Sequence, residues 1–265
     1  MITTLSIVIV NYNGKKFLKE CFESIQQAFK KTSYEIIVVD NNSADGSSDW
    51  IKNNYPDIVL IQSKENLGFG KGNNLGVSHA KGKYILLLNN DTILLDPLDD
   101  LIDQLENNPK IGAIGIKMLD KNKNYLPSAG HFPNLLNILI FKKLFNTQKD
   151  FVTGNFNQKS YEVDWVTGSF VLLKKDTYHL IKGFDEDYFM YVEDIDFCKK
   201  INLIGLRNIF LPSYSYIHFV GFNKSRNLQI IDSLKLYIHK HIKNPILRLF
   251  YLFNLEISQT IKKIK

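Results

Sequence analysis

The chain has 265 residues, of which 45% are hydrophobic and 23% charged, and its formal net charge at pH 7 is +6. This composition is that of a globular protein and excludes a disordered chain, while two distant cysteines exclude a disulfide framework or a cysteine-rich zinc site. The same two cysteines indicate a reduced, cytoplasmic setting. Because the chain runs straight into an apolar strand and holds no long apolar stretch, we expect no cleavable signal and no membrane span.

Short apolar strands alternate with helices over the first half of the chain. Strands buried on both faces are expected at 5–11, 34–40, 58–62 and 84–89. Helices are expected between them at 17–29, 47–54 and 70–80. Asp96 and Pro97 are expected to open another helix as N-cap and first-turn proline. The alternation predicts an α/β fold with parallel strands joined by right-handed crossovers.

The pattern loosens after residue 110. There we expect strands at 111–117 and 165–173 and a helix at 192–203. A pair of helices, interrupted at Pro245, is expected over 228–255. Residues 120–160 read as irregular, apart from an apolar patch at 135–141.

The positive charge is concentrated at the end of the chain. Residues 221–265 hold nine Lys or Arg and two acids, a net +7, which leaves the first 220 residues at −1. A protein that bound nucleic acid across its main body would carry its cations there, so we do not expect nucleic acid as a partner.

Polar side chains follow three of the predicted strands where each strand ends. These clusters hold Asn11 and Asn13, then Asp40 and Asn42, then Asn89, Asn90 and Asp91. A single cluster is ordinary turn and cap chemistry. Because the carboxyl ends of parallel strands share one edge of a sheet, three clusters together predict a polar, partly anionic binding crevice.

A glycine-rich segment, 66–76, follows the third strand and enters a helix. A dinucleotide fingerprint would follow the first strand, so the segment is not read as one. Lys71 and Asn74 within it suggest contact with a ribose or a phosphate. The other reading is a tight turn with close packing of the helix.

Carboxylates stand out at two places. Asp91 follows a rigid apolar strand, where it could hold a divalent cation against phosphate oxygens or merely cap the next turn. The segment 183–199 interleaves six acids with aromatic residues, which is either a solvated helix start or a set of partly buried groups suited to general-base chemistry. Glu193 and Asp194 belong to it.

Histidines offer fewer signals. His218, among aromatic residues and followed by Gly221, Lys224 and Ser225, is either a core residue or part of a metal–diphosphate site. His239 and His241 lie on the C-terminal helical pattern, and we expect both at the surface.

Together these segments resemble glycosyltransferase family 2, the inverting transferases of GT-A fold, and especially its rhamnosyltransferase-like branch. The matching segments are 6–13, 39–43, 66–76, 88–92, 167–170 and 183–196. The resemblance implies a Rossmann-like mixed central sheet flanked by helices, with a catalytic domain at 1–225 and basic amphipathic helices at 226–265 as an appendage.

The resemblance also implies the role of each candidate residue. Asn11 and Asn13 would line the pocket for the nucleotide base, with Asp40 accepting a hydrogen bond from the base and Asn42 beside it. Asn74 and Lys71 would lie near the ribose and the phosphates. The segment Asn89-Asn90-Asp91 stands where many members have Asp-x-Asp, so Asp91 would hold Mg²⁺ or Mn²⁺, with help from His218. The departure is Asn89 at the first acidic position.

A mechanism follows from these roles. The cation would neutralise the charge that develops on the leaving nucleoside diphosphate. Asp194 would take the proton of the acceptor hydroxyl, with Glu193 beside the acceptor, and one in-line displacement would invert the anomeric centre. The resemblance points to dTDP-rhamnose as donor and to a glycan or lipid-linked acceptor.

The basic C-terminal segment, 226–265, suggests a partner, and two alternative functions stay open. A basic amphipathic tail suits the inner face of an anionic membrane, or else packing on the catalytic domain or a homodimer contact. The alternative functions are a nucleotidyltransferase that makes the donor and a catalytically silent sugar-nucleotide-binding protein. The run 11–16 fits the first poorly, and the intact Glu193-Asp194 pair argues against the second.

Overall fold

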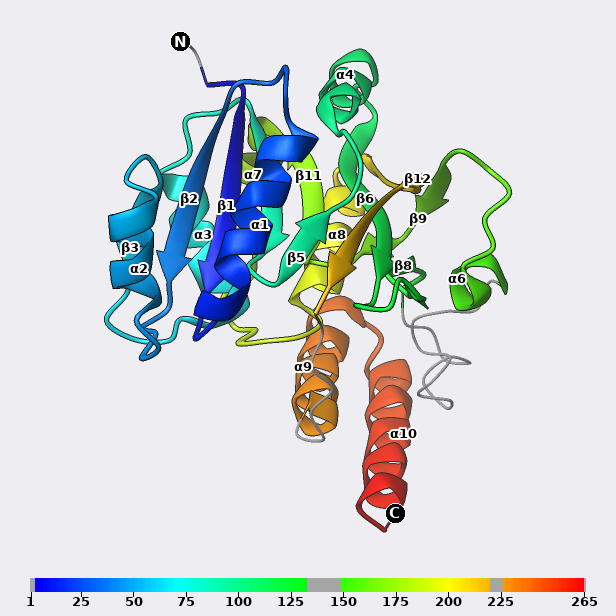
Figure 1. The fold of residues 1–265 in the computed structure, drawn as a ribbon. Coiled ribbons are helices and arrows are strands. Elements are labelled where there is room, and N and C mark those ends of the chain that lie inside the picture. The colour runs from blue at the N-terminus through cyan, green and yellow to red at the C-terminus, as the bar shows by residue number, and fades with distance from the viewer. Residues whose placement is uncertain (1–2, 133–148, 220–225, 265) are drawn as a thin grey trace.

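The computed structural model describes residues 3–132, 149–219 and 226–264 (Figure 1). The strands of these ranges are β1 Leu5–Asn11, β2 Tyr34–Asp40, β3 Val59–Gln62, β4 Tyr84–Asn89, β5 Thr92–Leu94, β6 Ile111–Leu119, β7 Tyr125–Leu126, β8 Ala129–Gly130, β9 Tyr161–Val163, β10 Trp165–Val166, β11 Phe170–Lys174 and β12 Arg207–His218. The helices are α1 Lys15–Ala28, α2 Ser47–Asn54, α3 Gly68–Ser78, α4 Asp99–Asn107, α6 Lys149–Thr153, α7 Lys175–Leu180, α8 Glu193–Leu203, α9 Arg226–His241 and α10 Pro245–Ile264.

The first four strands form the parallel half of the sheet, in the order β3-β2-β1-β4. Side chains of β1 alternate between the two faces, as the period of two requires. Ile7 packs in the core beneath α1, with Phe22, whereas Val8 packs in the core beneath α3, with Val77. Helices therefore cover both faces, which confirms the predicted α/β alternation.

Close approach of α3 to the sheet explains part of the glycine-rich segment. A Cβ at Gly76 would lie 2.3 Å from Cγ1 of Val8, and one at Gly72 would lie 2.9 Å from Cγ1 of Val10. Any larger residue at either position would push the helix off the sheet. Gly72 and Gly76 thus allow close packing of α3 on the sheet, which was one of the two interpretations of this segment.

An antiparallel strand joins the two halves of the sheet. β11 pairs antiparallel with β4 on one side and with β6 on the other, and the sheet continues through β12 to β5. The sheet is therefore mixed, as the resemblance implied. The predicted strand 165–173 is two strands, because the chain leaves the β8–β10 ribbon at residues 167–169 before it enters β11.

The helix expected at Asp96-Pro97 begins later, at Asp99. The Asp96 carboxylate is not an N-cap, because its Oδ2 accepts hydrogen bonds from Ser215 in β12, from the N–H at 2.7 Å and from Oγ at 2.9 Å. The short strand β5 comes between β4 and this helix and pairs with the end of β12. A tertiary contact has here overridden a local helix-start signal.

The C-terminal helices α9 and α10 extend from the edge of the sheet at which the parallel strands end (Figure 1). Leu234 and Ile238 of α9 and Leu255 of α10 are buried in the same apolar cluster as residues of the sheet. The helical spacing and its break at Pro245 are confirmed, and α10 runs on beyond the predicted 255. None of the helices in the described ranges combines the length and apolar character needed to cross a bilayer.

Two expectations lie outside the described residues, namely the apolar patch at 135–141 and the segment with Gly221, Lys224 and Ser225. The expectation that both tail histidines lie at the surface is wrong for one of them. His239 is exposed, but His241 is not, because its ring lies against Asp196 and only 15% of its side chain is exposed.

Candidate active site

The three predicted polar clusters meet in one hydrogen-bond network. Nδ2 of Asn11 donates to Oδ1 of Asp40 over 2.8 Å, and Nδ2 of Asn90 donates to Oδ1 of Asn11 over 2.7 Å. Asn11 is thus the central residue, because β1 lies between β2 and β4 in the sheet. The structure therefore brings the three predicted clusters together at the carboxyl ends of the strands.

Asp40 organises the loop that follows β2. Only 3% of the residue is exposed, and its carboxylate accepts hydrogen bonds from Asn11, from the N–H and Oγ of Ser43, and from Oγ of Ser48 at 2.6 Å. A nucleotide base that bonds to Asp40 would therefore share a carboxylate already held by several protein donors.

Asn13 and Asn42 shape the rim of the crevice. Both are exposed and both adopt left-handed backbone conformations, with φ of 52° and 62°, which asparagine tolerates better than most residues. Oδ1 of Asn13 accepts from the N–H of Ala44 over 2.8 Å, so this side chain ties the loop after β1 to the loop after β2.

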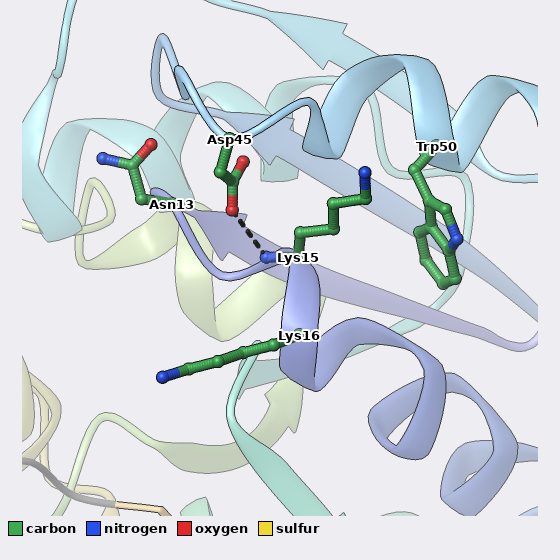
Figure 2. A pocket seen from close by; sticks show the side chains of 5 residues that line it. All are labelled: Asn13, Lys15, Lys16, Asp45 and Trp50. Carbon is green, nitrogen blue, oxygen red and sulfur yellow. Dashed lines mark hydrogen bonds between the residues drawn. The ribbon is translucent and has the colours of Figure 1, made fainter.

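A cavity of about 550 Å³ opens beside this rim, which is within the size range of ligand pockets. It is lined by Asn13, Lys15, Lys16, Asp45 and Trp50. Figure 2 shows Asn13 and Asp45 near one another and the Lys15 side chain extending toward Trp50, while the main-chain N–H of Lys15 donates to Asp45 over 2.9 Å. The two lysines and Trp50 were not among the sequence candidates, although a pair of lysines directly after a strand-end cluster was a usable signal.

A second cluster lies at the end of β4. Nε2 of His218, at the end of β12, is 3.0 Å from Oδ1 of Asp91 and 3.1 Å from Nδ2 of Asn89. The His218 and Asp91 side chains are mostly buried, at 13% and 19% exposure. Nδ1 of His218 is buried and has no hydrogen-bond partner among the described residues.

These residues fit a divalent cation. Adjacent ligands of an octahedral ion bound at about 2.1 Å lie about 3.0 Å apart, and the Asp91 oxygen and the His218 nitrogen are separated by that distance. Within the described ranges, His, Cys, Asp and Glu form no group of three that could hold a metal. A cation here would accordingly take most of its ligands from phosphate and water, as Mg²⁺ usually does.

Gly168 and Ser169 connect this cluster to the predicted base. The carbonyl oxygen of Ser169 accepts from the N–H of Asn89 over 3.1 Å, and the N–H of Gly168 donates to Oδ2 of Asp194 over 3.1 Å. Burial raises the pKa of the neighbouring Tyr216, and the negative charges of both Asp91 and Asp194 add to that increase. Asp194 therefore bonds to this turn directly, the cluster at the end of β4 reaches it through Asn89, and both acids act on the Tyr216 side chain.

Glu193 and Asp194 are adjacent in sequence but differ in environment. Glu193 is 6% exposed and its Oε2 has no hydrogen-bond partner among the described residues, whereas Asp194 is partly exposed. Burial raises the pKa of Glu193 well above its usual value, and the neighbouring charge of Asp194 raises it further. Burial therefore disfavours the charged form of Glu193, and Asp194 is the more exposed carboxylate of the pair.

The turn before α8 is strained. Tyr191 and Val192 both have left-handed backbone conformations, with φ of 70° and 69°. For a β-branched residue such as valine this is an outlier that costs about 1–3 kcal/mol and persists only where surrounding contacts impose it. The strain lies directly in front of Glu193 and Asp194.

The glycine-rich segment contributes less to the crevice than its composition suggested. Nδ2 of Asn74 donates to the Phe184 carbonyl and to Glu186, and its Oδ1 accepts from the Tyr178 hydroxyl and the Phe184 N–H, at 2.6–3.0 Å. Asn74 therefore links α3 to the acidic segment, and a ribose would have to displace one of these bonds. Lys71 is exposed on α3.

Comparisons with known proteins agree with this geometry. Residues 6–176 match the family model "Glycosyl transferase family 2", and the chain belongs to that family. It is 30% identical to "Rhamnosyltransferase WbbL" of Escherichia coli K12 over 222 residues, 80% of this chain and 82% of the relative. It is 26% identical to "N-acetylglucosaminyl-diphospho-decaprenol L-rhamnosyltransferase" of Mycobacterium tuberculosis over 247 residues, 86% and 80% of the two chains.

The fold is also found among solved structures. A structure titled "Crystal structure of GalNAc-T7 with UDP, GalNAc and Mn2+" superposes with a TM-score of 0.64 at 14% identity, covering 88% of this chain and 48% of that one. This confirms the GT-A fold implied by the sequence resemblance. The protein is a sugar transferase of this family, with rhamnosyltransferases among its relatives.

Proposed function

We propose that the protein transfers a sugar, with L-rhamnose the first candidate, from a nucleoside-diphosphate donor to a hydroxyl of a lipid-linked glycan, with inversion. One observation supports this most directly. Asn89, whose side chain contacts His218 of the Asp91–His218 pair, bonds to Ser169. Asp194 bonds to the adjacent Gly168, so that a diphosphate and an attacking hydroxyl can be held on the two sides of one turn. The names of the two rhamnosyltransferases suggest the donor sugar and the lipid-linked acceptor.

Each part of the crevice has a role in this proposal. The network of Asn11, Asp40 and Asn90 and the neighbouring cavity would receive the nucleoside. Asp91 and His218 would hold Mg²⁺ or Mn²⁺ at the diphosphate, and the solved GT-A structure with UDP and Mn²⁺ is consistent with that. When bound, the cation supplies positive charge that offsets the charge developing on the leaving group.

Asp194 would act as the general base. The Gly168 N–H fixes its Oδ2, and the carboxylate removes the proton of the acceptor hydroxyl as the hydroxyl oxygen attacks the anomeric carbon. The sugar–phosphate bond breaks on the opposite side, and its electron pair leaves with the diphosphate. A single in-line displacement inverts the centre without an enzyme-bound sugar.

A pair of matched variants tests the assignment of the base. Asp194→Asn should retain donor binding and lose transfer, by about a hundredfold or more, because asparagine cannot accept the proton. Glu193→Gln should retain most of the transfer, because Glu193 is buried whereas Asp194 is partly exposed. Transfer from dTDP-rhamnose to a short-chain N-acetylglucosaminyl-diphospho-lipid is measured in both. The reverse result would assign the base to Glu193.

The helix α10 would place the enzyme at the inner face of the membrane that holds its acceptor. Its outward face carries a row of exposed apolar side chains at helical spacing, namely Ile246, Leu249, Phe250, Phe253 and Ile257. The sequence adds lysines at 262, 263 and 265, which suit anionic lipid headgroups. In Figure 1 the helix extends from the edge of the sheet that carries the crevice.

Sedimentation with vesicles tests this contact. The wild type should bind phosphatidylglycerol-containing vesicles more strongly than phosphatidylcholine vesicles, and Leu249→Gln/Phe253→Gln should weaken binding by more than about tenfold. Leu203→Gln is the control, because Leu203 is equally exposed, at 68%, but lies on α8. A concentration-dependent dimer that the double variant abolishes, without vesicle binding by the wild type, would assign this face to a second copy of the chain.

A further inference from the structure

The end of α9 contacts the acidic segment that carries the proposed base. Nε2 of His241 lies 2.6 Å from Oδ1 of Asp196, and Nζ of Lys240 pairs with Asp185 and, at 2.6 Å, with Asp187. Two turns earlier, Oγ of Ser233 donates to the Met190 carbonyl over 3.0 Å. The helix thus holds residues 185–196 from end to end.

The contact with Asp196 is made inside the protein. Asp196 is 1% exposed, and its other carboxylate oxygen, Oδ2, has no hydrogen-bond partner among the described residues. A buried carboxylate needs a partner, and His241 supplies the closer of its two contacts, since the Tyr188 hydroxyl lies 3.5 Å away. The His241 ring is itself packed on Tyr237, with centroids 4.5 Å apart.

Asp196 is two residues beyond Asp194 in the first turn of α8. The strained residues Tyr191 and Val192 stand before that turn, and such a conformation persists only where contacts on both sides impose it. Asp194 is fixed from the sheet side by Gly168. From the other side, α9 holds both ends of the strained turn, through Met190 and through Asp196.

We propose that His241 and Lys240 are positioning residues of the transferase: they lock the strained turn before α8 so that Asp194 faces the crevice. The inference rests on the proposed function of Asp194. It makes α9 part of the catalytic unit, although the predicted domain boundary at 225–226 assigned the helix to an appendage. The base is then fixed by two distant parts of the chain, residue 168 in the turn before β11 and residues 240–241 on α9.

Paired substitutions in the full-length protein test the proposal. His241→Leu removes the donor to Asp196, whereas His241→Gln keeps an N–H at similar reach. Lys240→Met and Lys240→Arg form the equivalent pair, and His239→Leu is the control because His239 is exposed on the same helix. The kcat and KM for dTDP-rhamnose are measured with Mn²⁺ and the lipid-linked acceptor, together with hydrogen exchange of residues 185–196.

We expect His241→Leu and Lys240→Met to lower kcat by about ten- to a hundredfold with donor KM within about twofold of the wild type. Exchange should accelerate in 185–196 but not in the sheet, and Gln and Arg should restore most of both properties. Wild-type kcat in both apolar variants overturns the proposal, and so does an equal loss of kcat and donor binding. If these variants behave as expected but Asp194→Asn transfers normally, His241 and Lys240 do position the turn before α8, but the assigned base is wrong.

Discussion

The main-chain N–H of Gly168 donates a hydrogen bond to Oδ2 of Asp194 over 3.1 Å, and it does so from a position where a side chain would crowd its neighbours. A Cβ at residue 168 would lie 2.9 Å from Cε1 of Phe69 and 3.4 Å from Cβ of Asp194. Gly168, which orients the proposed base, therefore lies between Asp194 and the Phe69 ring with little space for a side chain.

Gly168→Ala should accordingly impair catalysis more than donor binding. The added methyl group displaces either the turn or the Phe69 ring, so we expect a loss of kcat of about ten- to a hundredfold and a loss of stability of about 1–3 kcal/mol. Steady-state kinetics and denaturant unfolding measure both. Gly168→Ala/Phe69→Leu should recover part of the activity, because leucine removes the obstructing end of the ring; a double variant as poor as the single one would contradict this explanation.

Removal of the proposed cation ligand Asp91 should greatly reduce metal-dependent turnover. Asp91→Ala deletes the oxygen that lies 3.0 Å from Nε2 of His218, and we expect at least about a hundredfold loss of donor turnover. His218→Gln should raise the Mn²⁺ concentration needed for half-maximal activity. Turnover is followed as release of nucleoside diphosphate during Mn²⁺ titration. Full activity of the wild type in EDTA would rule out a metal role for this pair.

Glu193 should make the fold less stable as pH rises. Its pKa is raised in the folded state from an ordinary value of 4.5, mainly by burial, so between these two values the folded protein binds the proton more tightly than the unfolded chain does. Stability is full below pH 4.5 and falls as pH increases toward the folded-state pKa. Glu193→Gln should therefore raise Tm at pH 7–8, and the gain should shrink toward pH 4.

Thermal unfolding across this pH range measures the effect, with Glu20→Gln as the control because Glu20 is exposed on α1. A gain that is independent of pH, or one shown equally by the Glu20 variant, would mean that Glu193 is not held neutral in the folded protein.

Asp40→Asn should weaken the proposed nucleoside site. The asparagine amide would face donors from Ser43 and Ser48, and leaving such buried groups unpaired costs about 1–3 kcal/mol. We expect lower stability together with weaker binding of dTDP by calorimetry. Ser48→Ala, which removes only one donor, should show a smaller loss of stability. Unaltered dTDP binding in the Asp40 variant would separate this residue from the donor site.

The sequence pattern of strands and polar residues predicted the part of the candidate site that lies at the ends of the parallel strands. The clusters after β1, β2 and β4 were readable because consecutive strands of one sheet end at the same edge, and the structure joins them through Asn11. The same reasoning cannot locate contacts made late in the chain. The pairing of His241 with Asp196 depends on how α9 packs, and an exposed helix face shows the same sequence pattern.

Local signals failed where tertiary contacts competed with them. Asp96 has the sequence of a helix cap, but the N–H and hydroxyl of Ser215 bind its carboxylate. The strand pattern at 165–173 continued through residues 167–169, because apolar periodicity does not show when a chain changes sheets. The glycine-rich segment was ambiguous for a similar reason, since glycine permits both phosphate approach and close helix packing.

The position of β11 between β4 and β6 has a consequence for biosynthesis. During translation β4 emerges from the ribosome long before β11, so the nascent chain carries an open strand edge beside Asn89 until residues 170–174 have been made. Insertion of that one strand closes the edge, unites both halves of the sheet and brings residues 168–169 against the end of β4. Asp194 on α8 and His218 on β12 follow that strand in the chain, so the base side and the metal side of the site are completed only after β11 has been made.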